Sequence, residues 1–120
     1  MSVGADKIID FKEAAAEEIR YSPDAEKILA GNPEQMVQNF YTDDSNQFSA
    51  GIWSGRPGQH KVNYTEEEFC QILEGVVILH DASGNSRRFE KGDSFVIPAG
   101  FQGIWETVET ARKIYVVYEK

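Results

Sequence analysis

Two side chains capable of chemistry, Glu68 and Cys70, stand two residues apart in one apolar stretch of the sequence. Side chains alternate between the two faces of a β-strand, so both are expected on the same, inward face. A carboxylate in a dry pocket can transfer a proton as a general acid or base, which makes Glu68 the candidate catalytic residue. The alternative for Glu68 is an ion pair with a nearby basic residue. Cys70 could be a nucleophile, but a buried free cysteine is more often a small hydrophobic core residue.

The residues just before this stretch could line a pocket beside Glu68. His60 and Lys61 are adjacent, so they cannot both point inward on a strand. Lys61 could pair with Glu68, bind an anion or form a Schiff base, and otherwise it is a solvated lysine. Gly103 and Trp105 share a phase, so space left by the glycine could be filled by the indole or by a ligand. The predicted ligand-pocket residues are Trp53, Lys61, Asn63, Tyr64, Cys70, Gly103 and Trp105.

Three other charged or titratable residues have simpler interpretations. His80 precedes a predicted hairpin loop over residues 81–85 and is expected at the surface. The pair Arg112 and Lys113 precedes the last predicted strand. An anion could bind there, but salt bridges to the nearby acidic residues Glu106 or Glu109 are the preferred expectation.

Short strands separated by turn signals must position these side chains. The expected strands cover residues 48–53, 60–64, 68–73, 76–80, 87–89, 94–97, 102–106 and 113–118. Such spacing is typical of a β-sandwich or closed barrel. Several strands are apolar in both phases, whereas one barrel has a single interior. We therefore expect the outer apolar positions to be covered by the N-terminal arm, by a second subunit in a homodimer, or by both.

The first 47 residues differ from this pattern and are predicted to form an N-terminal arm, followed by a barrel core over residues 48–120. Residues 11–20 contain good helix formers and predict a short helix or a frayed arm. A single helical turn is expected over residues 22–29, and a first strand over residues 36–41. The arm is expected to pack on the barrel or on the dimer partner.

Composition narrows the classes of function. The chain has 120 residues, a net charge of −8 and no cluster of Lys and Arg, which disfavours binding to nucleic acid or to an anionic membrane. One cysteine allows no internal disulfide. No apolar stretch is long enough for a membrane span, and the N-terminus has no signal-peptide pattern. A cytoplasmic location is the default expectation.

Two stretches resemble the paired motifs of the cupin superfamily. Residues 64–75 (YTEEEFCQILEG) match the second half of the first motif, with six residues between Glu68 and Gly75. Residues 92–107 (GDSFVIPAGFQGIWET) are similar to the second motif, with its glycines and proline in register at Gly92, Pro98 and Gly100. The amino-acid sequences of both stretches resemble the branch named for the (S)-ureidoglycine aminohydrolase cupin domain. The resemblance implies an all-β, double-stranded β-helix barrel of the RmlC-like jelly-roll type.

The same resemblance implies a degenerate metal site. Metal-binding cupins use three His and one Glu, but this chain has only two His. The positions of the first two histidines fall on Lys61 and Asn63 or, with a shorter spacer, on Val62 and Tyr64, and that of the third falls on Gly103. Only Glu68 matches a metal ligand. We therefore expect no cofactor; the alternative, a divalent Mn, Fe, Ni or Zn ion, would need Glu68 together with Asn63, Cys70 or His60 as ligands.

Together these features predict a cupin that binds a small molecule inside its barrel. Similarity implies hydrolase or lyase chemistry on a small polar metabolite, nitrogenous or carboxylated, with Glu68 as the proton-transfer group. The competing interpretation is a non-catalytic ligand sensor or accessory cupin. An open cavity with an unpaired Glu68 favours the enzyme, and a filled interior with a paired Glu68 favours the sensor.

Overall fold

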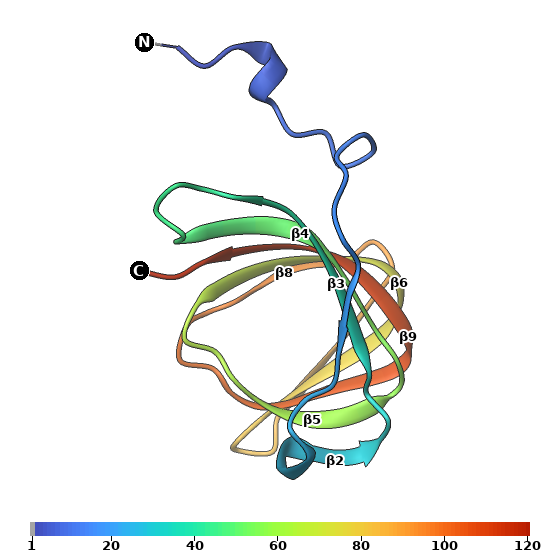
Figure 1. Cartoon of the computed structure of the whole chain (residues 1–120). Helices are drawn as coiled ribbons and strands as arrows, with labels where there is room; N and C mark the ends of the chain where they lie inside the picture. The colour runs from blue at the N-terminus through green and yellow to red at the C-terminus, as the bar shows by residue number, and fades with distance from the viewer. Residues whose placement is uncertain (1) are drawn as a thin grey trace.

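The computed structural model describes residues 2–120 and consists almost wholly of β-strands (Figure 1). Two short 3-10 turns, η1 (Ala5–Lys7) and η2 (Ala25–Lys27), are its helical elements in that range. The strands are β1 (Ile19–Tyr21), β2 (Ile28–Gly31), β3 (Gln35–Thr42), β4 (Phe48–Gly55), β5 (Gly58–Asn63), β6 (Glu67–Asp81), β7 (Ser86–Glu90), β8 (Ser94–Ile97) and β9 (Gln102–Tyr118).

The long strands β6 and β9 join the sheet into a barrel. The first part of β9 pairs with β5 and with the second part of β6, and its last part pairs with β4 and with the beginning of β6. The sheet follows the strand order β1-β3-β4-β9-β5-β2. Strand β6 lies off this path and pairs with β7, β8 and β9. All of these pairings are antiparallel, and the sheet curls around one interior (Figure 1). The predicted all-β barrel is confirmed.

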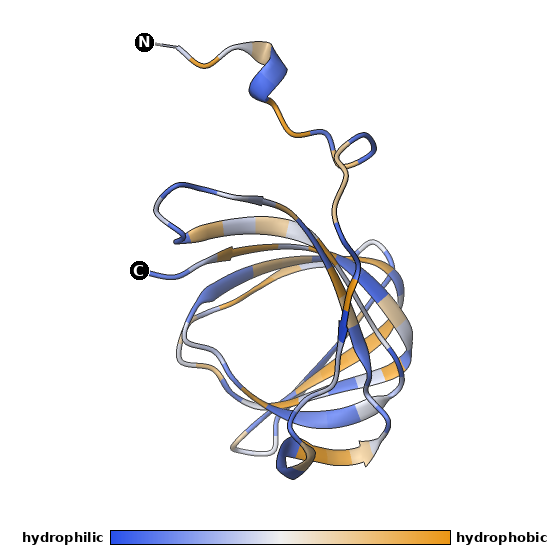
Figure 2. Cartoon of the chain, in the orientation of Figure 1, coloured by the Kyte–Doolittle hydropathy of each residue, from blue (hydrophilic) through white to orange (hydrophobic). Residues whose placement is uncertain are grey.

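Alternating hydropathy explains why these segments form strands around a core (Figure 2). Along β9, the residues Trp105 and Thr107 and then Ala111, Lys113 and Tyr115 are buried, while their neighbours are more exposed. This period of two is that of a strand with one inward face. The core cluster comprises Trp53, Cys70, Ile72, Val77, Leu79, Ile97, Trp105, Ala111 and Tyr115.

In the N-terminal region the helix alternative for residues 11–20 is wrong, whereas the single helical turn expected over residues 22–29 is present as η2. Residues 11–20 form a turn, in which the amides of Glu13 and Ala14 donate to the Asp10 carbonyl, followed by extended chain and β1 rather than a helix. A helix there would have almost no apolar face to bury, and helix propensity alone is too weak to hold a short isolated helix. Residues 22–29 contain only the η2 turn before β2 begins.

The predicted strand over residues 36–41 is confirmed as part of β3. The N-terminal strands join the barrel sheet, since β1 pairs with β3, β3 with β4, and β2 with β5. The chain before β1 extends away from the barrel (Figure 1). No helix in the described part of the chain is long and apolar enough to cross a membrane.

The two strands predicted over residues 68–73 and 76–80 are one strand, β6, interrupted by irregular register around Gly75. Gly75 has φ +86°, in the left-handed region that favours glycine. A Cβ atom there would collide with the backbone of β9, at the Thr110 carbonyl oxygen and at the Ala111 Cα. The glycine therefore lets β6 bend while it stays paired with β9.

We predict that Gly75→Ala destabilises the protein far more than Gly92→Ala. Gly92 also has a positive φ, +92°, but a Cβ atom there meets nothing within 4 Å. Gly92→Ala should cost about 1 kcal/mol of unfolding free energy from backbone strain, whereas Gly75→Ala should cost roughly 3 kcal/mol because β9 must also move. Urea denaturation measures both values, and equal losses would contradict this account of the bend.

Candidate functional site

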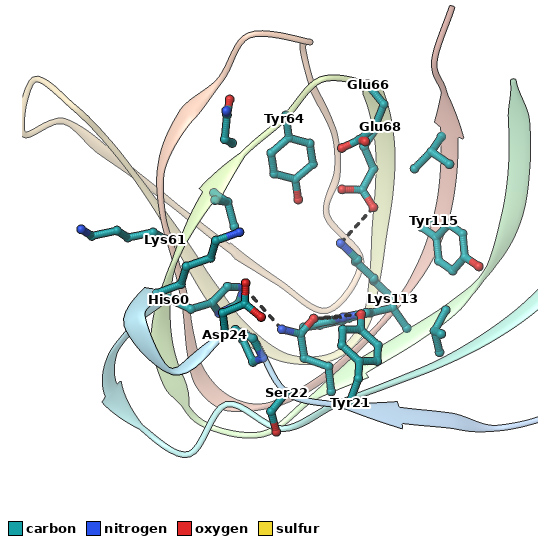
Figure 3. A pocket seen from close by; sticks show the side chains of 18 of the residues that line it. Tyr21, Ser22, Asp24, His60, Lys61, Tyr64, Glu66, Glu68, Lys113 and Tyr115 are labelled. Carbon is teal, nitrogen blue, oxygen red and sulfur yellow. Dashed lines mark hydrogen bonds and ion pairs between the residues drawn. The ribbon is translucent and has the colours of Figure 1, made fainter.

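A cavity of about 660 Å³ opens inside the barrel between β3, β4, β5, the beginning of β6 and the end of β9 (Figure 3). The segment that leads from β1 into η2 borders the cavity with Tyr21, Ser22, Pro23, Asp24 and Lys27. The volume lies within the range of small-molecule sites in proteins. Its lining combines charged, amide and aromatic side chains, so it suits a polar ligand.

A buried ion pair between Lys113 and Glu68 lies in the cavity wall. The Lys113 Nζ atom is 3.1 Å from Glu68 Oε2, and the two residues are only 4% and 6% exposed. The same ammonium lies 4.2 Å from the ring centroid of Trp105 and 4.8 Å from that of Trp53. A carboxylate and two indole faces thus replace the water that a lysine normally binds.

Strand register brings these groups together. Lys113 is the direct cross-strand partner of Trp53 on β4 and of Ile72 on β6. Glu68 lies two inward positions before Ile72 on the same strand, so its side chain points to the same interior. The pair is therefore positioned by backbone hydrogen bonds of the barrel itself.

Lys113 is held as an ammonium ion. Burial alone would lower its pKa, but the carboxylate of Glu68 and the neighbouring Cys70 outweigh burial and raise the pKa above the ordinary 10.5. Because the folded-state pKa lies above the value in the unfolded chain, the pair stabilises the fold fully below about pH 10.5, and this contribution is lost as the pH rises through the folded-state pKa. A lysine that stays protonated near neutral pH is not a nucleophile.

A chain of hydrogen bonds around Gln35 forms another part of the wall. Trp53 Nε1 donates to Gln35 Oε1 at 2.7 Å, and the Tyr21 hydroxyl donates to the same oxygen at 3.0 Å. Gln35 Nε2 lies 3.4 Å from His60 Nε2. Burial, and then the positive charges of Lys113 and Lys27, lower the pKa of His60 below its ordinary value. The His60 imidazole is therefore neutral at neutral pH.

The opposite part of the cavity is acidic and phenolic, with Glu66, Glu68 and Tyr64 together (Figure 3). Burial, followed by the charges of Glu119 and Glu68, raises the pKa of Glu66. Burial and then Glu68 hold the pKa of the Tyr64 phenol well above its ordinary value, so the phenol keeps its proton. These groups can offer carboxylate acceptors and a hydroxyl to a ligand nitrogen.

Tyr115 and Asn39 complete the wall near the end of β9. The Tyr115 hydroxyl donates to Asn39 Oδ1 at 2.7 Å. Burial is the main reason that the pKa of Tyr115 is raised to about 12. The phenol remains neutral and can still accept a hydrogen bond from a ligand.

Of the predicted site residues, Trp53, Tyr64 and Glu68 line the cavity, as do Lys61 and Asn63 at its border. The side chains of Lys61 and Asn63 are exposed, whereas His60 is buried. The inward-facing residues of this segment are therefore His60, Val62 and Tyr64. The two histidine positions of the first cupin motif then fall on Val62 and Tyr64, as the shorter spacer predicts. One alternative for Lys61, a pair with Glu68, is wrong, because the carboxylate is bound by Lys113.

The other three predicted pocket residues do not line the cavity. Cys70 and Trp105 belong to the core cluster behind the cavity wall. Cys70 is fully buried, and burial is the main cause that raises its pKa to about 12, so the thiol stays protonated. A Cβ atom on Gly103 would collide with the backbone carbonyl oxygen of His80 on the paired strand β6. The glycine therefore leaves no space for a ligand inside the barrel.

The remaining charged residues also differ from expectation. His80 is half-buried, and its Nε2 lies 2.8 Å from Glu106 Oε1. Arg112 pairs at the surface with Glu74 at 3.5 Å, not with Glu106 or Glu109. These contacts lie across the β6–β9 pairing, which strand boundaries alone did not specify.

Sequence reasoning missed Lys113 as a cavity residue, along with Gln35, Asn39 and Tyr115. A signal was present in the last strand, where Lys113, Tyr115 and Val117 share one phase. A lysine among large inward side chains predicts either a solvated stem or a buried ion pair. Gln35 and Asn39 carry no comparable local signal, because their roles depend on strand pairing.

The residues present do not fit a cupin metal. At the motif positions, Val62 and Gly103 offer no donor, and Tyr64 offers a phenol that keeps its proton. Glu68, the remaining match, is already bound by the Lys113 ammonium, and a nearby ammonium repels a metal cation. Within residues 2–120, no three His, Cys, Asp or Glu side chains lie close enough to hold a metal ion.

Barrel topology, paired motif glycines and an interior cavity together define a cupin-type domain. The chain belongs to the family of the EutQ-like cupin domain, whose family model matches residues 42–115. The cupin superfamily and jelly-roll fold predicted from the motifs are thus confirmed, while membership in the ureidoglycine aminohydrolase branch stays a prediction. No curated protein is significantly similar in sequence.

Solved structures show the same fold at low identity. The EutQ protein of Clostridium difficile is similar with a TM-score of 0.66 and 18% identity over 82% of this chain and 80% of that one. A protein of unknown function from Pseudomonas syringae pv. tomato gives a TM-score of 0.77 and 23% identity over 91% of this chain, which spans 46% of that protein's length. Ectoine synthase from P. lautus gives a TM-score of 0.62 and 12% identity, over 79% of this chain and 70% of that one.

We predict that the buried pair, unlike its surface neighbour, is critical for stability. Lys113→Met leaves the Glu68 carboxylate buried without a partner and should lower the unfolding free energy by about 3–5 kcal/mol. The double variant Lys113→Met with Glu68→Gln should recover part of this loss. Arg112→Met is the matched control, because it removes an exposed pair with Glu74 and should cost less than about 1 kcal/mol. Urea denaturation at pH 7 measures all three, and a Lys113→Met loss as small as that of the control would contradict the account.

Proposed function

We propose that this protein is a small-molecule-binding cupin whose ligand site is the barrel cavity beside Glu68 and Lys113. The observation that carries the proposal is the cavity of about 660 Å³ with a buried carboxylate, a buried ammonium and three phenols on its wall. Burying charges is costly for a fold, and sites that do so are functional candidates. The ligand is a small polar metabolite that contains nitrogen or a carboxylate.

Glu68 supports a second candidate, a hydrolase or lyase that acts on the same class of metabolite. Its carboxylate lines the cavity next to Tyr64 and is buried from bulk water. In that role Glu68 takes a proton from the substrate or its attacking water, and the ammonium of Lys113 stabilises the negative charge that develops. The pairing of Glu68 with Lys113 favours plain ligand binding, whereas the size of the cavity is compatible with turnover.

A ligand screen with matched variants tests the proposal. The untagged full chain is screened by thermal shift and by tryptophan fluorescence, since Trp53 lines the cavity, against amino acids, amides, ureas and small carboxylic acids. We expect at least one class to bind, and Glu68→Gln to weaken it by about tenfold or more. Glu67→Gln is the control, because Glu67 is the exposed neighbour on the same strand.

Two outcomes would decide against the proposal. Equal loss of affinity in Glu67→Gln and Glu68→Gln would place the ligand elsewhere. Stoichiometric Mn, Fe, Ni or Zn in elemental analysis of the purified protein, lost in Glu68→Ala, would replace it with a metal-dependent function. Product formation with any bound metabolite, detected by mass spectrometry, would favour the hydrolase or lyase over the sensor.

We further propose that the protein is a homodimer, as its outward apolar residues suggest. Phe69 on β6 and Val96 on β8 are direct cross-strand partners, and they are 38% and 59% exposed. In the projecting N-terminal chain, Val3 and Ile8 are 78% and 75% exposed. Apolar side chains at these positions would be shielded from water by a second copy of the chain.

Sedimentation analysis of the full chain tests the dimer. We expect the mass of two chains at micromolar concentration, and a shift toward one chain in Val96→Lys, because a charge would be buried in the interface. Asn32→Lys, at an exposed position between β2 and β3, adds the same charge at a residue that does not share a pocket with Val96, and it should leave the mass unchanged. A monomer at all concentrations would refute the proposal.

A further inference from the structure

One polar atom in the cavity wall lacks a partner. His60 lines the cavity, and its side chain belongs to a residue that is only 8% exposed. Within the described part of the chain, its Nδ1 atom is the buried side-chain nitrogen or oxygen that has no hydrogen-bond partner. Buried polar groups in folded proteins are nearly always paired. This nitrogen is enclosed in the wall, so a bound molecule that supplies its partner must displace the side chains that cover it.

The hydrogen-bond chain fixes which kind of partner this nitrogen needs. An indole N–H can only donate, so Trp53 Nε1 requires the oxygen of the Gln35 amide at its position. The amide nitrogen of Gln35 then faces His60 Nε2, and an amide nitrogen can only donate. His60 Nε2 must accept, which places the proton of the neutral ring on Nδ1. The unpaired atom is thus a donor and requires an acceptor oxygen.

The charges around His60 suit an oxygen with negative character. The ammonium groups of Lys113 and Lys27 lie close enough to lower the pKa of His60, after the larger effect of burial. Asp24 lies on the same side of the cavity (Figure 3) but does not bond to His60. Glu66, Glu68 and Tyr64 lie on the opposite side (Figure 3). Glu68 is already bound by the Lys113 ammonium, so the free acceptor at that side is Glu66. The cavity therefore has a donor end at His60 and an acceptor end at Glu66.

We propose that His60 Nδ1–H donates a hydrogen bond to a carboxylate or carbonyl oxygen of the ligand, whose nitrogen faces Glu66. The ligand class is thus narrowed to small molecules with an acceptor oxygen at one end and an amine or amide nitrogen at the other. This inference rests on the proposed ligand site in the barrel. It adds the orientation of the ligand and the residue that selects for the oxygen.

The state of the ring is the first test. The chain has two histidines, so nitrogen-15 spectra of the ring nitrogens can be assigned with His80→Gln as the reference variant. At pH 7 we expect a neutral His60 ring with its proton on Nδ1. A proton on Nε2, or a doubly protonated ring, would overturn the inference before any ligand is added.

Four probes with the same three-carbon chain then test the ligand class: propionate, propionamide, propylamine and β-alanine. Propionate and propionamide present an acceptor oxygen, propylamine does not, and β-alanine presents both an oxygen and an ammonium group. We expect the His60 Nδ1–H resonance to move with the first two and with β-alanine but not with propylamine, and β-alanine to bind about tenfold more tightly than propionate. Preferential binding of propylamine, or a His60 resonance that no probe moves at millimolar concentration, would overturn the inference.

Two substitutions of His60 separate recognition from structure. The amide of Asn can place a nitrogen near the position of Nδ1, whereas the longer Gln reaches only the position of Nε2. His60→Gln should therefore weaken β-alanine binding about tenfold, while His60→Asn should stay within about threefold of the unaltered protein. The opposite order would overturn the inference. Ligands that still bind beside Glu68 but are insensitive to both substitutions would refute the role of His60 and leave the proposed function standing.

Discussion

The ammonium group of Lys113 imposes the constraint on which the interior depends. A charge at this depth must be compensated, and the barrel supplies a carboxylate at 3.1 Å and two indole faces within 5 Å. Each of these partners comes from a different strand: Glu68 from β6, Trp53 from β4 and Trp105 from β9 itself. Neutralising the charge therefore requires that the barrel is closed.

The same constraint shapes the chemistry of the cavity. In a metal-binding cupin the motif glutamate binds an ion taken from solution, whereas here Glu68 binds a cation that belongs to the chain. The side chain of Lys113 stays protonated across the physiological pH range, because Glu68 raises its pKa. Trp53 also donates to Gln35, and Gln35 orients His60. The indole that covers the ammonium thus begins the hydrogen-bond chain that determines how the other end of the cavity is protonated.

Much of the fold could be predicted from the sequence, because it depends on local signals. Alternating apolar residues located most strands, and the spacing of Gly75, Gly92, Pro98 and Gly100 identified the superfamily. The single strand β6 could not be predicted, since a glycine between two apolar runs indicates a turn as well as a bulge. For residues 11–20 the helix, one of two alternatives, rests on propensity without an apolar face, which is weak evidence in a β protein.

The site could be predicted only in part, because its residues come from strands that meet through long-range pairing. Glu68 was found from the motif, and Tyr64 and Trp53 from their aromatic character. Lys61, the nearest lysine along the chain, is a possible partner of Glu68 by sequence, but it is on the outward face of β5. Lys113 is 45 residues away from Glu68 in sequence and becomes its neighbour only through the β6–β9 pairing.

Strand β9 has a mechanical consequence for ligand entry. One continuous segment of 17 residues carries Trp105 and Ala111 in the core and then Lys113 and Tyr115 in the cavity wall. Because it is hydrogen-bonded to β4, β5 and β6, a shift at the cavity would disturb the packed core as well. The wall is therefore preorganised, and little ordering entropy is lost in it on binding. Adjustment to a ligand falls instead to residues 22–24 between β1 and η2, which lie outside the paired strands, whereas Tyr21 is held by strand pairing with Gln35 as well as by its side-chain hydrogen bond.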